Sequence, residues 1–151
     1  MLKLLKNPYS GGGCFFCGPQ NPIGLKLEFY ETGDGPKELV CLWRPDKLYR
    51  GLGSVLHGGI QCGLFDEIMG WTTHHLMGHS AVTGELNTKF LKPVRLGRRI
   101  EVRCRIDQVK GREVWLEAEI TDESGQVCTK ARGSYVLIAE ERFRELMGGS
   151  D

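Results

Sequence analysis

The most informative stretch of the chain is residues 57–71, which read His57-Gly-Gly-Ile-Gln-Cys-Gly-Leu-Phe-Asp66-Glu-Ile-Met-Gly-Trp71. Apolar residues recur here every three or four positions and share one face of a helix; they are Ile60, Leu64, Ile68 and Trp71, with Phe65, Met69 and Leu76 widening the face. An ordinary surface helix shows a narrower stripe, so the pattern predicts a long helix, from about 58 to 76, buried by other elements. Gly78 is a typical residue for its C-terminal end.

An aspartate lies in the middle of this predicted helix. Aspartate is unfavourable there because its short carboxylate competes for backbone hydrogen bonds. Asp66 lies off the apolar face, among residues that leave room for a ligand, namely Cys62, Gly63, Gly70 and Thr73. The pair Gly58-Gly59 leaves backbone N–H groups unobstructed at the positive end of the helix dipole. An anion-stabilising helix start and a carboxylate two turns away are the two parts of an acyl-transfer site.

Length and charge restrict the class of protein. A chain of 151 residues is expected to form one domain with its own core. A formal net charge of +1 argues against bulk attraction to nucleic acid or to a membrane surface. The stretch from Lys89 to Arg112 nevertheless holds nine lysines and arginines against Glu101 and Asp107. This stretch is therefore a candidate phosphate-binding site, with a solvated strand face as the equal alternative.

Cysteine usage and hydropathy predict a cytoplasmic protein. No segment approaches the roughly 20 apolar residues of a membrane span, and residues 1–6 are too short for a signal sequence. The six cysteines are therefore expected to be reduced. Cys14 and Cys17 have the spacing of half a zinc site, but a structural site needs four ligands and there is no second such pair. The sequence thus predicts neither a metal nor a cofactor.

The order of the predicted elements indicates an α+β domain. Residues 1–24 are rich in Gly, Pro and Cys and are expected to be an irregular lead-in, residues 25–139 the domain, and residues 140–151 a short tail. Alternating apolar residues predict strands near 25–30, 38–44, 82–90, 100–106, 114–120 and 126–138. We expect a curved antiparallel sheet of about five or six strands wrapped around one long central helix. Its open edges favour dimerisation by edge pairing.

Three groups of residues resemble a known family. They are Cys14-Phe-Phe-Cys-Gly-Pro-Gln-Asn-Pro-Ile-Gly-Leu25, then Leu56-His-Gly-Gly-Ile60 with Leu64-Phe-Asp-Glu67, and Ala81-Val-Thr-Gly-Glu-Leu-Asn-Thr-Lys-Phe90 with Lys92-Pro-Val94. In these motifs the chain resembles the hotdog-fold thioesterases, specifically the phenylacetate-degradation-type branch, over about residues 14–138. The resemblance implies hydrolysis of an acyl thioester, usually acyl-coenzyme A, without a metal. It also implies a homodimer that assembles as a dimer of dimers, with the lead-in packed over the subunit or beside the substrate tunnel.

The resemblance also implies roles for single residues. Asp66 matches the catalytic carboxylate, acting either as general base on a water or as nucleophile that forms a mixed anhydride. Gly58 matches the glycine whose N–H binds the thioester carbonyl. His57 would orient the loop or contact the thioester, and Thr83 matches a hydroxyl that holds the water near the carboxylate across the dimer. Asp66, His57 and Thr83 have structural alternatives, namely a structural aspartate, a backbone-bonded histidine and an ordinary strand residue.

Further residues are candidates for binding the substrate. Gly59 belongs to the same helix start, and Asn87 is expected on the strand face that carries Thr83. The basic turn of Arg95, Arg98 and Arg99 suits bidentate contact with coenzyme A phosphates.

One position departs from the family pattern. Some relatives carry an asparagine that polarises the carbonyl where this chain has Gly51. The second oxyanion donor would then be the backbone, His57, or absent. The alternative functions are a non-catalytic acyl-CoA-binding or regulatory protein, which Gly51 favours, and a dehydratase, which needs a paired histidine and carboxylate. Hydrolysis of an acyl-CoA thioester remains the prediction.

Overall fold

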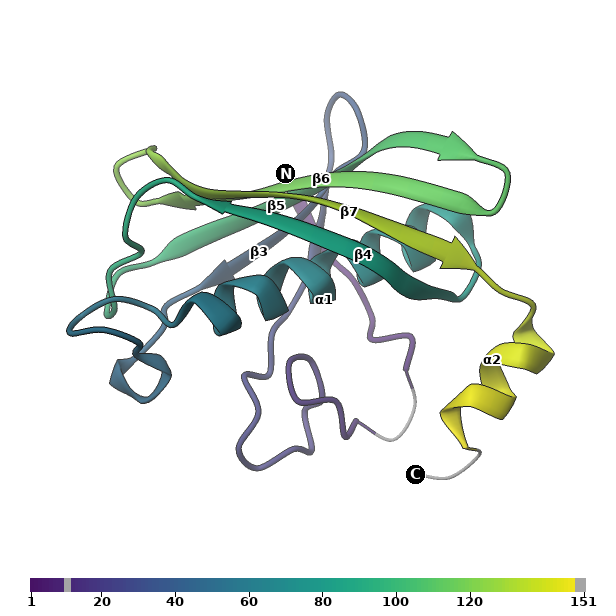
Figure 1. Ribbon diagram of the computed structural model, residues 1–151, viewed down its shortest axis with the longest axis horizontal. Coiled ribbons are helices and arrows are strands. Elements are labelled where there is room, and N and C mark those ends of the chain that lie inside the picture. The colour runs from purple at the N-terminus through teal and green to yellow at the C-terminus, as the bar shows by residue number, and fades with distance from the viewer. Residues whose placement is uncertain (10–11, 149–151) are drawn as a thin grey trace.

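A single antiparallel sheet curves over helix α1 (Gly58–Met77), as Figure 1 shows. The computed structural model describes residues 1–9 and 12–148. Its seven strands follow the order β1-β2-β3-β5-β6-β7-β4. Their bounds are Leu2–Leu4 (β1), Tyr30–Thr32 (β2), Leu39–Trp43 (β3), Ala81–Phe90 (β4), Ile100–Lys110 (β5), Glu113–Asp122 (β6) and Val127–Leu137 (β7). A 3-10 turn (Lys47–Tyr49) precedes α1, and a second helix, α2 (Glu140–Met147), follows the sheet. The predicted α+β architecture is confirmed, with seven strands instead of five or six.

Helix α1 begins and ends where local chemistry predicts. The Nδ1 atom of His57 accepts a hydrogen bond from the Gly59 N–H at 2.8 Å and so caps the first turn. Gly78 ends the helix in the left-handed conformation (φ 69°), which glycine adopts without strain. Between these ends the helix buries its apolar residues under the sheet, where Leu64, Phe65, Ile68 and Met69 are at most 1% exposed. The prediction of a long, buried central helix is confirmed.

The N-terminal region differs from the prediction. Leu25, Leu27 and Phe29 alternate and are buried, but they precede the strand. The Leu25 and Leu27 N–H groups donate to the Phe15 and Phe16 carbonyls, at 3.0 and 2.9 Å, so this segment pairs with the lead-in loop. The strand expected at 25–30 is therefore wrong in position, because alternation reports burial and not which backbone is the partner.

The lead-in also contributes a strand that was predicted to be irregular. Strand β1 pairs with β2 in antiparallel register, with Leu2 opposite Thr32. After β1 the chain forms a loop on the side of α1 that faces away from the sheet, drawn in purple in Figure 1. Helix α1 is thus covered by the sheet on one side and by this loop on the other.

A glycine allows the loop to dock against α1. A Cβ atom added at Gly63 would lie 2.0 Å from Cζ of the Phe16 ring, which is far inside van der Waals contact. Phe16 therefore packs directly on the helix backbone at this position. None of the helices in the described ranges is both long enough and apolar enough to span a bilayer.

We expect Gly63→Ala to destabilise the protein, although alanine is normally the better helix residue. The new methyl group would displace Phe16, and overpacking of this kind typically costs about 1–3 kcal/mol. Gly70→Ala is the matched control on the same helix, because its nearest neighbour would be Cε1 of Tyr135 at an ordinary 3.8 Å. Urea unfolding of both variants measures the difference. A Gly63→Ala midpoint equal to or above that of Gly70→Ala would show that Phe16 does not pack there.

Candidate active site

The Asp66 carboxylate is held by two hydroxyl groups from the sheet. The Thr83 Oγ1 donates to Asp66 Oδ1 at 2.8 Å, and the Tyr135 hydroxyl lies 2.6 Å from the same oxygen. The Tyr135 hydroxyl is also 2.7 Å from the Asp66 backbone carbonyl, so its one proton is shared between two acceptors of the same residue. In the described part of the chain, Asp66 Oδ2 has no hydrogen-bond partner, and the side chain is exposed. One carboxylate oxygen is thus fixed and the other is accessible.

Sheet register brings the two hydroxyls together. Thr83 on β4 is directly opposite Tyr135 on β7, so both side chains point to the face that packs on α1. Thr83 donates within its own subunit, where the resemblance implied a role across a dimer. Tyr135 was missed by the sequence analysis. It lies 69 residues from Asp66, so no local pattern in the sequence linked the two residues.

The environment keeps Tyr135 protonated. The residue is 2% exposed, and burial raises the pKa of its phenol well above the ordinary value, with the charge and hydrogen bond of Asp66 adding to the shift. Because the phenol does not ionise at neutral pH, it is a permanent hydrogen-bond donor to the carboxylate.

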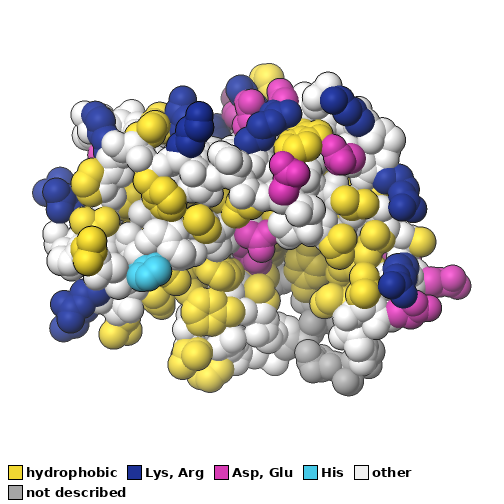
Figure 2. All heavy atoms as spheres, viewed as in Figure 1, with side chains coloured by type: hydrophobic (Ala, Val, Ile, Leu, Met, Phe, Trp, Pro, Cys, Tyr) yellow, Lys and Arg dark blue, Asp and Glu magenta, His cyan; other side chains and the backbone are white. Residues whose placement is uncertain are grey.

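The accessible side of Asp66 faces a cavity of about 450 Å³. Thr83 and Tyr135 line it from the sheet, and Cys14, Glu67 and Trp71 line it from the lead-in and α1. Helix α2 contributes Phe143 and Met147. On the face that the space-filling view shows, hydrophobic side chains lie around an acidic group near the centre, and the lysines and arginines lie mostly toward the edges (Figure 2).

The start of α1 presents the Gly58 N–H as an available backbone donor. The Gly59 N–H is used by His57, which excludes it from binding a substrate as long as the cap is in place. The Gly58 N–H has no hydrogen-bond partner in residues 1–9 and 12–148, and Gly58 lines a second cavity together with Gly51 and Phe90. The His57 ring caps the helix by accepting this backbone hydrogen bond. Of the two roles considered for His57 from the sequence, this geometry is that of the backbone-bonded histidine.

A buried glutamine braces this turn. The Gln61 Nε2 donates to the Leu56 carbonyl at 3.1 Å, and its Oε1 accepts from Thr129 at 2.5 Å. Gln61 was not singled out by the sequence analysis, although a polar residue inside an apolar helix face was visible there.

Gly58 and Asp66 do not share a cavity within one chain. They are eight residues apart on α1, which corresponds to about 12 Å at the helical rise. The cavities that they line have no residue in common. A single subunit therefore separates the donor from the carboxylate.

The expectation that Asn87 shares the face of Thr83 is wrong. A β-bulge between Thr83 and Glu85 adds one residue to β4, and this reverses the alternation that follows. Asn87 accordingly lies in a groove with Lys89 and Arg103, whereas Thr83 lies in the Asp66 cavity. The structure does not bring Asn87 to Asp66.

The basic turn lies beside the start of α1. Arg98 and Arg99 are exposed, and neither forms a salt bridge within the described ranges. The Arg95 guanidinium donates to Ser54 Oγ at 3.3 Å. Backbone hydrogen bonds tie this turn to the segment before the helix, including Leu56 N–H to the Val94 carbonyl at 2.8 Å. The three arginines are thus on the Gly58 side of the molecule.

Comparison with known proteins identifies the family. Residues 53–129, just over half of the chain, match the family model described as the thioesterase superfamily. The chain therefore belongs to this superfamily, and the sheet wrapped around α1 is its hotdog fold.

Individual relatives agree with this assignment. Acyl-coenzyme A thioesterase THEM4 of Bos taurus is 24% identical over 129 residues, which are 85% of this chain and 52% of that protein. The chain thus spans about half the length of this curated relative. Two solved structures share the fold, each with a TM-score of 0.66. Streptococcus mutans smu.793 bound to acetyl CoA is 19% identical, with 74% of this chain and 89% of that one covered. The E. coli PaaI protein from the phenylacetic acid degradation operon is 16% identical, with 74% and 80% covered.

The Tyr135 hydrogen bond predicts a pH-dependent stability difference. We expect Tyr135→Phe to lower the free energy of unfolding at pH 7 by about 1.5–3 kcal/mol, as for other hydrogen bonds to charged groups. Above the ordinary tyrosine value of 10.0, the wild-type tyrosine ionises in the unfolded chain but not in the folded one. The wild type therefore loses stability as the pH rises through this range, and Tyr135→Phe does not lose this contribution.

The two proteins are expected to converge in stability as the pH rises above about 10. Urea unfolding at pH 7, 9 and 10.5 measures the difference, and the shared cysteines and Tyr9 cancel in the comparison. A constant difference across the three pH values would contradict the geometry around Tyr135.

Proposed function

We propose that this protein hydrolyses an acyl-CoA thioester to the free acid and coenzyme A. The observation that carries the proposal is the Asp66 carboxylate, which has one oxygen fixed by Thr83 and Tyr135 and the other open to a cavity. Membership of the thioesterase superfamily and similarity to a protein named acyl-coenzyme A thioesterase support the same reaction. A cytoplasmic location agrees with the expected reduced thiols and stays a prediction.

The complete site is proposed to form between two subunits. Strand β4 is at the end of the sheet order, so one of its edges is open for pairing. It runs antiparallel to α1, with Thr83 against Asp66 and Phe90 near Gly58. Antiparallel pairing of β4 with its copy would therefore bring Asp66 of one subunit to Gly58 of the partner subunit. This closed, twofold arrangement explains why one chain keeps the two groups apart.

The side chains exposed along this edge support such an interface. Val82 and Phe90 are 37% and 55% exposed on β4, and Leu91, directly after it, is 54% exposed. Figure 2 shows hydrophobic groups across the side that carries β4. Burying them would favour a homodimer, and a dimer of dimers follows from the family resemblance alone.

The proposed chemistry divides between the two groups. As the thioester carbonyl is attacked, its oxygen gains negative charge, which the Gly58 N–H stabilises. Asp66 either removes a proton from the attacking water or attacks the carbonyl carbon itself. In both routes the C–S bond breaks and the thiolate of coenzyme A leaves and is protonated; in the second route a water then hydrolyses the mixed anhydride, which releases the free acid and regenerates Asp66. The fixed Oδ1 orients the carboxylate so that Oδ2 faces the reacting carbon.

Coenzyme A would be recognised by the basic turn. Arg95, Arg98 and Arg99 lie on the Gly58 side, and guanidinium groups bind phosphates in a bidentate manner. The nucleotide end of the substrate would then lie on the subunit that supplies the oxyanion donor.

A second candidate function is binding of acyl-CoA without hydrolysis. Gly51 lines the Gly58 cavity and supplies no side-chain donor there. The absence of a polarising side chain at this position favours weak or absent turnover. A dehydratase gains no support, because the His57 ring is engaged at the Gly59 N–H.

Replacing the carboxylate separates these functions. We expect Asp66→Asn to lower kcat by about 10²–10⁴-fold, the usual contribution of a general base. The fold should be retained, because the amide oxygen still accepts the Thr83 and Tyr135 hydrogen bonds. Release of free thiol from aryl, short and long acyl-CoA esters measures turnover, with Asp34→Asn in an exposed loop as the control. Undiminished turnover in Asp66→Asn would remove Asp66 from the mechanism, and a wild type that binds these esters without releasing thiol would support the binding protein.

Removing the Gly58 N–H tests the oxyanion donor. Gly58→Pro deletes this donor at the first helical position, where proline is tolerated, and should lower kcat by about 10²–10³-fold. Gly58→Ala keeps the N–H and is the matched control, since its Cβ would be an ordinary 3.4 Å from the Phe90 ring.

Mixing the two inactive proteins tests the shared site. A heterodimer of Gly58→Pro and Asp66→Asn subunits contains one intact pair if the site forms between subunits and none if it forms within one. Co-expression with two affinity tags isolates the heterodimer. Recovered turnover is expected, and its absence in a properly formed heterodimer would contradict the proposed arrangement.

A further inference from the structure

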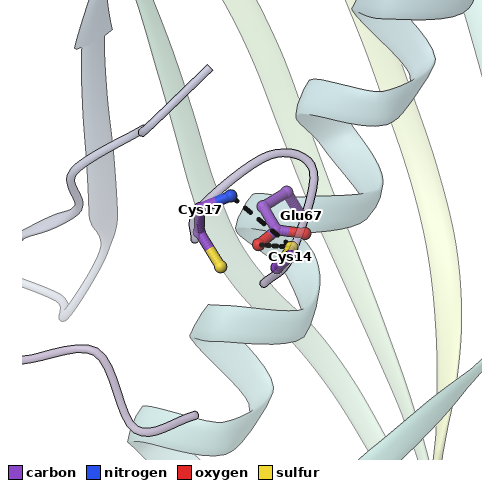
Figure 3. Close-up of side chains that lie close together, drawn as sticks. All are labelled: Cys14, Cys17 and Glu67. Carbon is purple, nitrogen blue, oxygen red and sulfur yellow. Dashed lines mark hydrogen bonds between the residues drawn. The ribbon is translucent and has the colours of Figure 1, made fainter. Parts of the chain in front are cut away.

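Three potential metal ligands converge where the lead-in crosses α1. They are the Cys14 and Cys17 thiols and the Glu67 carboxylate, whose ligand atoms all lie within 4.8 Å of one another (Figure 3). The Cys14 thiol donates to Glu67 Oε1 at 3.4 Å, and the Cys17 N–H donates to Cys14 Sγ at 3.5 Å. Glu67 directly follows Asp66 in the chain, and both line the same cavity.

The spacing of these atoms suits one tetrahedral ion. Zinc binds thiolate sulfur at about 2.3 Å and carboxylate oxygen at about 2.0–2.2 Å, so two sulfurs on one ion lie roughly 3.8 Å apart. The observed spacing of up to 4.8 Å needs only a small closure of the cysteine loop. Three protein ligands leave the fourth position for a water from the cavity. The chemistry of two thiolates and a carboxylate suits zinc-class cations better than magnesium or calcium.

A buried indole supplies an independent indication. Trp71 is 3% exposed, and its Nε1 has no hydrogen-bond partner in the described residues. A buried donor without a partner is costly, and so calls for an acceptor. Trp71 and Cys17 belong to the same buried cluster, and Trp71 lines the cavity together with Cys14 and Glu67. A metal-bound thiolate at Cys17 would accept that N–H.

Glu67 also lacks a cation to balance its charge. It forms no salt bridge within residues 1–9 and 12–148. Burial raises the pKa of the neighbouring Tyr9 phenol to about 12, and the charge of Glu67 adds to this shift. A divalent ion would neutralise an otherwise anionic corner of the cavity.

We propose that Cys14, Cys17 and Glu67 bind a single zinc-class divalent cation that fastens the lead-in loop to α1. Binding releases the two thiol protons to solvent, and the thiolates and the carboxylate become the ligands. The ion stabilises the loop that forms one wall of the Asp66 cavity. The site does not depend on hydrolysis, and it replaces the expectation of no metal. That expectation counted only cysteines and histidines, and the third ligand comes from a helix 50 residues after Cys17.

Cobalt substitution tests the site directly. The full chain is stripped with a chelator under reducing conditions and titrated with Co²⁺, then with Zn²⁺. We expect one equivalent of Co²⁺, with thiolate-to-metal charge transfer and tetrahedral visible bands that Zn²⁺ abolishes. Cys14→Ser should lose most of the charge-transfer band. Glu67→Gln should keep the band but bind Co²⁺ at least about tenfold more weakly. Loss of a residue that only hydrogen-bonds to a metal ligand already lowers metal affinity by about this factor.

Cys62→Ser is the matched control. Cys62 lies on α1, as Glu67 does, but its thiol contacts Thr88 and is not part of the Cys14–Cys17–Glu67 cluster. Zn²⁺ should raise the Tm of the wild type and of Cys62→Ser but not that of Cys14→Ser, which separates ligand loss from misfolding. The proposal is overturned if Co²⁺ does not bind, if Cys14→Ser binds it as the wild type does, or if Glu67→Gln shows unchanged affinity. A Cys14–Cys17 disulfide that forms in the presence of excess Zn²⁺ would also overturn it.

Discussion

Burial of α1 between the sheet and the lead-in is the interaction on which the rest of the structure depends. Leu64, Phe65, Ile68 and Met69 are almost completely buried, and each such side chain contributes about 1.5–3 kcal/mol relative to exposure. These contacts fix the rotation of the helix about its own axis. Because Asp66 follows directly after Phe65, its carboxylate then points to the part of the sheet where β4 begins and β7 ends.

The sheet compensates for an aspartate that the helix alone would disfavour. Thr83 and Tyr135 supply hydroxyl donors from two neighbouring strands, and the buried phenol cannot ionise at neutral pH. A network of this kind holds the carboxylate in one orientation, because each donor is itself fixed by strand pairing. These hydrogen bonds offset the unfavourable position of Asp66 in the helix, and they also fix the orientation of its carboxylate toward the cavity.

The opposite side of α1 shows how small residues admit a second layer. Gly63 lets Phe16 rest on the helix backbone, and this contact brings Cys14 and Cys17 of the same loop to Glu67. The cavity therefore has one wall from the sheet and one from the loop. Anything that fastens the loop, such as the proposed ion, would also shape the space beside Asp66.

Local patterns in the sequence were sufficient for α1, its C-terminal glycine, the free Gly58 N–H and the position of Asp66 off the apolar face, whereas the capping role of His57 was one of two alternatives. These features depend on residues within a few turns of one another, so periodicity and capping chemistry determine them. The tertiary structure decided what depends on long-range register and packing. A bulge in β4 moved Asn87 to the other face, pairing of β4 with β7 brought Tyr135 to Asp66, and loop docking joined Glu67 to two cysteines. The tertiary structure also placed Gly58 and Asp66 in separate cavities, with no lining residue in common.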